Sequence, residues 1–198
     1  LPRRRHLQGL ALGGGYAYWI TSEGDDDGAV LRASLSGGEP EVVVRERGGL
    51  SAIALDGDTV YFARAPRVTR DEDGGALGGV YQLARGKTDA RRVLAAEAPC
   101  ALAVDASSVY VVEPLQIWRA PKAGNAAAKK IAEGGARLGC SIALDAQHAY
   151  WTIPANDTLM RAKKVDGSSP SALAFLKKRP TNVVVDGGYA YVLTETTC

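Results

Sequence analysis

The sequence predicts an all-β chain of about five repeated units, each a four-stranded antiparallel sheet. The first observation is a motif that recurs with a period in the forties, which is typical of repeat folds. Its copies lie at residues 8–20, 50–63, 99–112, 139–152 and 180–193. The second observation is that each copy has the pattern of two short strands around a turn. The third is that two further strands fit between consecutive copies, and four antiparallel strands per roughly 40–45 residues predict the blade of a β-propeller.

The inner hairpin of each unit is clearest in the fourth copy. The apolar run at residues 142–144 is too short for a helix and predicts a buried strand. Asp145 ends this run, and aspartate or glycine here favours a turn. The second strand, residues 149–152, is rich in aromatic and β-branched residues, as strands are. The turn position is Gly13, Asp56, Asp105, Asp145 or Asp186, and five residues later comes Tyr18, Tyr61, Tyr110, Tyr150 or Tyr191. We predict that the aspartates cap the turns and that the tyrosines pack the blades.

Two outer strands complete each unit. The predicted third strands are residues 30–33, 80–83, 117–120 and 159–162, each leading into a polar turn. The predicted fourth strands are residues 42–44, 92–94, 130–132 and 173–175. Lysine and arginine lie in or beside each fourth strand, and such charge protects an exposed sheet edge from pairing with other chains.

The units predict a single propeller domain over residues 1–198. The unit bounds lie near 8–49, 50–98, 99–138 and 139–179, with the last unit formed by 180–198 together with 1–7. The basic segment Arg3–Leu7 is predicted to be the end of an outer strand. The last unit has no room for its third strand, so we expect Tyr189–Leu193 to form an exposed apolar edge. Either the natural chain continues past Leu1 and Cys198, or another chain supplies the missing strands by strand addition.

The Asp–turn–Tyr-Trp-Thr arrangement from Asp145 to Thr152 resembles the YWTD, NHL and virginiamycin-B-lyase-like group of propellers. Within this group the chain is most similar to secreted bacterial repeat proteins of unassigned function, and the resemblance covers nearly the whole chain. It implies a fold and an extracytoplasmic location: secreted, periplasmic or at the cell surface. It implies no activity, because one fold supports many functions. The lyases of the group use histidine with acidic residues at the channel mouth, and no position here matches that motif.

Composition excludes several classes of function. A hydrophobic content of 46% is typical of a packed core. The net charge of +2 argues against nucleic acid as the main partner. The sequence contains no run of about 18 apolar residues, so it predicts no membrane-spanning helix. The sequence also lacks haem, zinc-protease and phosphate-loop motifs, so we expect no cofactor.

The candidate binding residues lie in the loops between strands two and three of the first two units, which are longer than the equivalent loops of the later units. Loops of this kind often carry function. These residues are Glu23, Asp25, Asp26, Asp27, Arg70, Asp71, Glu72 and Asp73. Carboxylates such as Asp25–Asp27 suit Ca²⁺, but their spacing departs from an EF-hand loop. We therefore interpret this segment as a solvated acidic loop and predict no metal site.

The three cysteines leave two interpretations open. Cys100 and Cys140 occupy the same position in neighbouring units, five residues before the aspartate. They are a disulfide candidate if their Cα atoms lie within about 7 Å, and otherwise two small buried thiols. An odd count leaves Cys198 unpaired within the chain or paired outside it.

These patterns favour binding over catalysis. Nucleophilic triads need a base, usually histidine, and we expect His6 and His148 to lie far apart. The sequence predicts a non-catalytic binding or scaffold module that engages a protein partner or a glycan through its loop-elaborated face or a sheet edge. The alternative is a metal-assisted lyase or hydrolase with its site at the mouth of the central channel.

Overall fold

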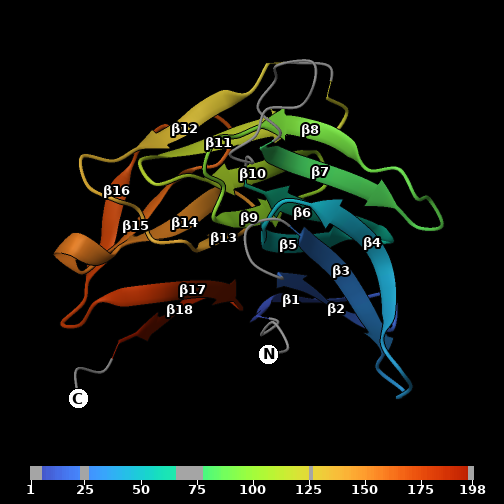
Figure 1. Ribbon diagram of the computed structural model, residues 1–198. Coiled ribbons are helices and arrows are strands. Elements are labelled where there is room, and N and C mark those ends of the chain that lie inside the picture. Colours follow the sequence, from blue (N-terminus) through green and yellow to red (C-terminus); the bar gives the residue numbers. More distant parts are fainter. Residues whose placement is uncertain (1–5, 23–26, 66–77, 125–126, 196–198) are drawn as a thin grey trace. The chain divides into compact units, whose positions relative to one another are not determined.

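The computed structural model describes residues 6–22, 27–65, 78–124 and 127–195 (Figure 1). The chain divides into two compact units, Leu1–Pro99 and Cys100–Cys198. A single domain over residues 1–198 stays a prediction.

The first unit contains two four-stranded antiparallel sheets, each with its strands in chain order. The first sheet is β1 (His6–Gly13), β2 (Tyr16–Ser22), β3 (Asp27–Ser34) and β4 (Glu41–Arg47). The second sheet is β5 (Leu50–Asp56), β6 (Thr59–Arg64), β7 (Gly79–Ala84) and β8 (Arg91–Ala95). The inner hairpins and outer strands predicted for the first two sequence repeats are confirmed.

The second unit contains two more such sheets and a terminal hairpin. The third sheet is β9 (Ala101–Val104), β10 (Ser108–Val112), β11 (Gln116–Pro121) and β12 (Lys129–Glu133). The fourth sheet is β13 (Ile142–Leu144), β14 (His148–Ile153), β15 (Thr158–Lys163) and β16 (Ser171–Phe175), with a short 3-10 turn, η1 (Pro154–Asn156), between β14 and β15. The terminal hairpin is β17 (Pro180–Asp186) and β18 (Tyr189–Thr194).

The prediction that an outer strand ends at Leu7 is wrong. His6 and Leu7 pair with Ser22 and Thr21, so they belong to the inner strand β1, while residues 3–5 lie outside the described part of the chain. The register of β1 shifts at Gly9, whose φ of 64° is a conformation that glycine adopts without steric cost. This bulge lets β1 begin earlier than the apolar pattern indicates.

The repeated tyrosine defines one face of every sheet, which we call the tyrosine face. In the first unit, the tyrosine face of the first sheet packs on the following sheet: Tyr18 and Ile20 belong to one core cluster with Ile53 and Phe62. The second unit repeats this arrangement twice. The clusters there join Tyr110 and Val112 to Ala149 and Trp151, and Tyr150 and Leu159 to Val183. Each of these tyrosine faces is therefore covered by the opposite face of the next sheet or hairpin.

The last tyrosine departs from this rule. Tyr18, Tyr61, Tyr110 and Tyr150 are buried as predicted, but Tyr191 is 58% exposed. Within the second unit, no further described sheet covers the tyrosine face of the hairpin, and its apolar side chains are exposed: Val184, Tyr189, Tyr191 and Leu193. The predicted exposure of the segment from Tyr189 to Leu193 is confirmed for its alternate residues, because Ala190 and Val192 pack against the fourth sheet.

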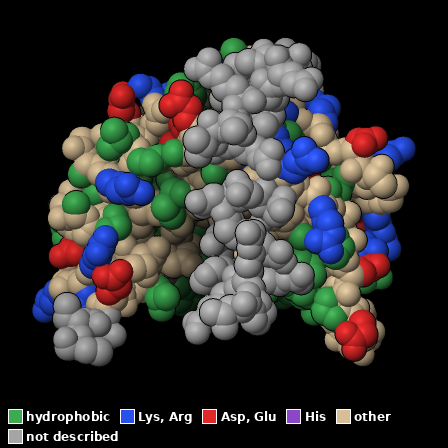
Figure 2. All heavy atoms as spheres, viewed as in Figure 1, with side chains coloured by type: hydrophobic (Ala, Val, Ile, Leu, Met, Phe, Trp, Pro, Cys, Tyr) green, Lys and Arg blue, Asp and Glu red, His purple; other side chains and the backbone are tan. Residues whose placement is uncertain are grey.

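The described surface carries both signs of charge. On the face that Figure 2 shows, basic and acidic side chains are interspersed among apolar ones, which fits the net charge of +2. Within the described residues, no helix has the length and hydropathy that crossing a membrane requires.

Candidate binding site at the terminal hairpin

The predicted loop residues cannot be assigned to a site. Asp27 begins β3, where its backbone pairs with Arg47, and nothing is described of its side chain. The other seven residues lie outside the described part of the chain: Glu23, Asp25, Asp26, Arg70, Asp71, Glu72 and Asp73. A binding surface on these loops therefore stays a prediction.

Cys100 and Cys140 form a disulfide, with Cα atoms 5.2 Å apart. Each cysteine comes just before an inner strand, β9 or β13, so the bond joins neighbouring sheets of the second unit. At the equivalent position of the second sheet, the hydroxyl of Ser51 instead donates a hydrogen bond to the carbonyl of Pro99, at 2.6 Å. Cys198 lies outside the described residues.

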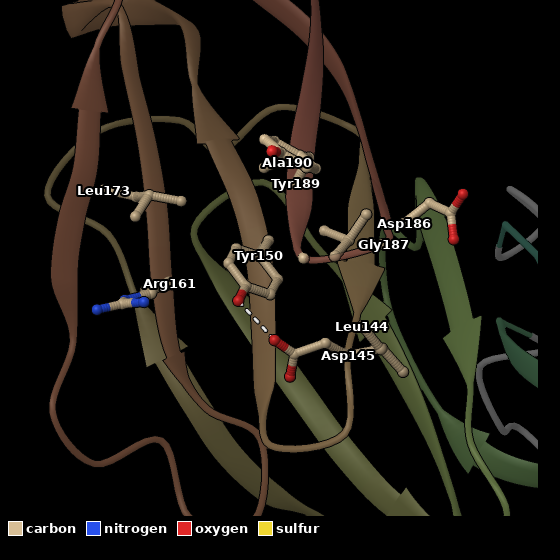
Figure 3. Close-up of a pocket in the computed structure, with 11 residues that line it drawn as sticks. Leu144, Asp145, Tyr150, Arg161, Leu173, Asp186, Gly187, Tyr189 and Ala190 are labelled. Carbon is tan, nitrogen blue, oxygen red and sulfur yellow. Dashed lines mark hydrogen bonds between the residues drawn. The ribbon is translucent and has the colours of Figure 1, made fainter.

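Asp145 caps the inner turn of the fourth sheet and also orients its tyrosine. One carboxylate oxygen accepts the backbone N–H groups of Gln147 and His148 at 2.7 and 2.6 Å, and the other accepts the Tyr150 hydroxyl at 2.6 Å (Figure 3). Burial opposes ionisation of Asp145, but these hydrogen bonds outweigh it and lower its pKa to about 2. Asp105 makes the same three contacts in the third sheet, with Ser107, Ser108 and Tyr110. The predicted capping role is confirmed at both positions.

Between the third and fourth sheets, a lysine fills the groove beside the capping aspartate. Lys164 directly follows β15, and its backbone N–H donates to the carbonyl of Gln147 at 3.0 Å. Its ammonium lies 3.0 Å from Oδ2 of Asp105 and donates to the carbonyl of Asp145 at 2.9 Å. The Lys164 and Asp105 side chains are only 14% and 19% exposed. The lysine thus links the aspartates of two neighbouring sheets.

The equivalent groove between the fourth sheet and the terminal hairpin is open. It is a pocket of about 320 Å³. Asp145, Tyr150, Arg161, Leu173, Asp186 and Tyr189 are among the residues that line it (Figure 3). The hairpin has no third strand among the described residues, and none of these residues stands in the position that Lys164 has in the neighbouring groove. Nδ1 of His148 lies 3.5 Å from Oδ2 of Asp145, and the Asp145 side chain is 33% exposed.

The hairpin also presents one strand edge. β18 pairs with β17 from Tyr189 opposite Asp186 to Thr194 opposite Pro180. The equivalent strands β2, β6, β10 and β14 each lie between two partners, whereas β18 pairs with no second strand in the described part of the chain. An edge of this kind exposes N–H and C=O groups to an incoming strand.

Sequence reasoning missed this pocket, although a signal for it existed. Alignment of the third strands places Lys122 and Lys164 at the same position, directly after the strand. Both donate their backbone N–H to the second residue after the capping aspartate, Ser107 or Gln147. The pattern assigns neither lysine a role, because a charge beside a polar turn usually faces solvent. In the described residues, no group of three or more His, Cys, Asp or Glu side chains is arranged to hold a metal ion.

Comparison with known proteins identifies the fold. No protein-family model matches the sequence, and no curated protein matches it. Among solved structures, a chain from the crystal structure of a nidogen/laminin complex matches with a TM-score of 0.77 and 19% identity, covering 96% of this chain and 72% of that one. Myxococcus xanthus glutaminyl cyclase matches with a TM-score of 0.55 and 14% identity, covering 96% of this chain and 86% of that one. At these identities the likeness concerns the fold alone: a β-propeller of about five antiparallel blades, the last of which is a hairpin within this chain.

Proposed function

We propose that this chain is a non-catalytic protein-binding module, and that it binds its partner by accepting a β-strand at the edge of β18. The observation that carries the proposal is the two-stranded hairpin, because every other described sheet has four strands. A protein partner is supported by the similar chain, which comes from a crystal structure of a nidogen/laminin complex. The competing proposal is that the chain binds a protein or a glycan through the loops between strands two and three of the first two sequence repeats.

The exposed side chains of β18 favour an incoming strand. Tyr189, Tyr191 and Leu193 alternate along β18 and are 58–69% exposed. Contiguous apolar groups on a surface indicate an interaction site. In strand addition, backbone hydrogen bonds supply affinity and the alternating side chains supply specificity. The hairpin offers both features on one strand.

The fourth sheet indicates the register of the incoming strand. There, β15 pairs with β14 so that Arg161 lies opposite Tyr150 and Leu159 lies opposite Thr152. The same cross-strand pairing places Arg32 opposite Tyr18, Gln82 opposite Tyr61 and Arg119 opposite Tyr110. We therefore expect a partner strand antiparallel to β18, with arginine or glutamine opposite Tyr191 and an apolar residue opposite Leu193.

The disulfide supports an extracytoplasmic location for this module, because disulfides persist mainly in oxidising compartments. Cell fractionation that places the full-length protein in the cytosol would contradict this part of the proposal.

A labelled peptide tests strand addition. The probe has the sequence of residues 157–166, which contains β15, and fluorescence anisotropy measures its binding to the 198-residue chain. We expect saturable binding. Two control peptides carry N-methyl groups on alternate backbone nitrogens, one on the even and one on the odd residues. Only one of these series removes the N–H groups that face β18, so strand addition requires one control to lose binding and the other to keep more of it. Equal binding by all three peptides, or no binding at all, would contradict the proposal.

A further inference from the structure

We infer that the strand bound at β18 is followed by a lysine whose ammonium enters the pocket beside Asp145. The inference rests on the proposed strand addition and deepens it, because it names a side chain that the partner must carry. It concerns a groove that the described part of the chain leaves open, between the fourth sheet and the terminal hairpin.

The junction between the third and fourth sheets is the template. Lys164 directly follows the third strand of the fourth sheet and binds three groups: the carbonyl of Gln147, the carbonyl of Asp145 and the carboxylate of Asp105. One repeat further along the chain, the equivalent groups are the carbonyl of Gly188, the carbonyl of Asp186 and the carboxylate of Asp145. The template thus gives the backbone N–H and the ammonium of the incoming lysine their partners on the fourth sheet and the hairpin.

The open groove has the charge and the room for this ammonium. Asp145 presents its carboxylate to the pocket, while the Asp186 carboxylate points away from Asp145 (Figure 3). A volume of about 320 Å³ is roughly ten times the share of one water molecule in the liquid, which accommodates a four-carbon stem and its ammonium. Because the Asp145 carboxylate holds its charge down to acidic pH, the ammonium meets an anion throughout the physiological range.

Arg161, which lines the pocket, is compatible with a lysine in the same groove. In the template, Arg119 occupies the position of Arg161 and donates to the Tyr110 hydroxyl at 3.2 Å and to the carbonyl of Val165 at 3.3 Å. Val165 is the residue next to Lys164, so an arginine and a lysine already share that groove. Lysine suits the second position because its ammonium is a compact charge with three donors, whereas the planar fork of arginine prefers to bind a carboxylate through two parallel bonds.

Three peptides test the inference on the 198-residue chain. The first has the sequence of residues 157–166, the second carries Lys164→Gln, and the third carries Lys163→Gln as a control of equal net charge. Lys163 is exposed in the fourth sheet, so its replacement should remove a charge without removing a contact with the protein. We expect Lys164→Gln to weaken binding about tenfold, as the loss of one charge-assisted hydrogen-bonding group does, and Lys163→Gln to change it by less than about twofold.

An Asp145→Asn variant of the protein completes the test. It keeps an oxygen that can cap the turn, and its thermal melt checks that it folds. We expect it to bind the unmodified and Lys164→Gln peptides equally. If the variant does not fold, the comparison of the two substituted peptides on the original chain still decides. Binding that is equal for all three peptides would leave strand addition standing and refute the lysine, whereas no binding of any peptide would refute the proposed function itself.

Discussion

Replacement of Tyr110 by alanine should destabilise the second unit by about 4–5 kcal/mol. The side chain is fully buried and packs in the core between the third and fourth sheets. Truncation of a buried aromatic costs about 3–5 kcal/mol. The Tyr110 hydroxyl also donates to Asp105 at 2.9 Å and accepts from Arg119 at 3.2 Å, and each lost hydrogen bond adds about 1 kcal/mol. Asp105 keeps its contacts with two backbone amides and with Lys164, which limits this added cost.

The chain supplies its own matched control for this substitution. Tyr191 occupies the same repeat position but is 58% exposed, so Tyr191→Ala should change the free energy of unfolding by less than about 0.5 kcal/mol. Urea unfolding followed by circular dichroism measures both variants, with tryptophan fluorescence as a second probe, because two compact units can unfold separately. A cost below about 1 kcal/mol for Tyr110→Ala, or similar costs for both variants, would refute the assignment of the tyrosine face as the packing face.

Three further predictions concern charge and covalent links. Asp145 has a folded-state pKa of about 2, below its usual value near 3.8, so its contribution is present above about pH 5 and is lost as the pH falls through 2; Asp145→Asn should flatten the acid limb of a stability–pH curve, and an unchanged limb would contradict this. Reduction of the inter-sheet disulfide, whose cysteines are 40 residues apart, should destabilise the second unit by about 4 kcal/mol at most, and melts with and without reductant measure the loss. Arg64→Ala should cost about 3–5 kcal/mol because it strands the largely buried Glu46 carboxylate, whereas Arg85→Ala at the exposed pair with Asp58 should cost less than about 1 kcal/mol; similar costs in urea titrations would argue against burial as the cause.

The strands could be predicted from the sequence because each repeat contains the local pattern of strands and turns. Short apolar runs, turn residues and aromatic strands are local signals, and they place the inner hairpins and the outer strands correctly. The repeat pattern alone could not predict that the Tyr191 side chain is exposed, because its exposure depends on what covers the hairpin; the expected exposed edge followed instead from the missing third strand. Tyr150 and Tyr191 have the same local sequence pattern, yet only Tyr150 has a following hairpin packed on its face.

The pocket could not be predicted from local sequence patterns, for a related reason. It is recognised by comparison with the neighbouring groove, which Lys164 fills through a contact with Asp105, 59 positions away (164 minus 105). The start of β1 was missed because the bulge at Gly9 interrupts the alternation of apolar residues. Both errors concern how one element meets another, which a period alone does not specify.

The third and fourth sheets are fastened together at both ends of their inner strands, by the disulfide before β9 and β13 and by Lys164 after them. Such a pair should open as one cooperative unit, with its slowest amide protons exchanging together. Within the second unit, the described part of the chain packs on one face of the hairpin only, so we expect its amides to exchange at a lower free energy of opening. A strand bound at β18 should therefore slow amide exchange in the hairpin as well as pair with its edge. The rise in protection at each hairpin amide would then measure strand binding residue by residue.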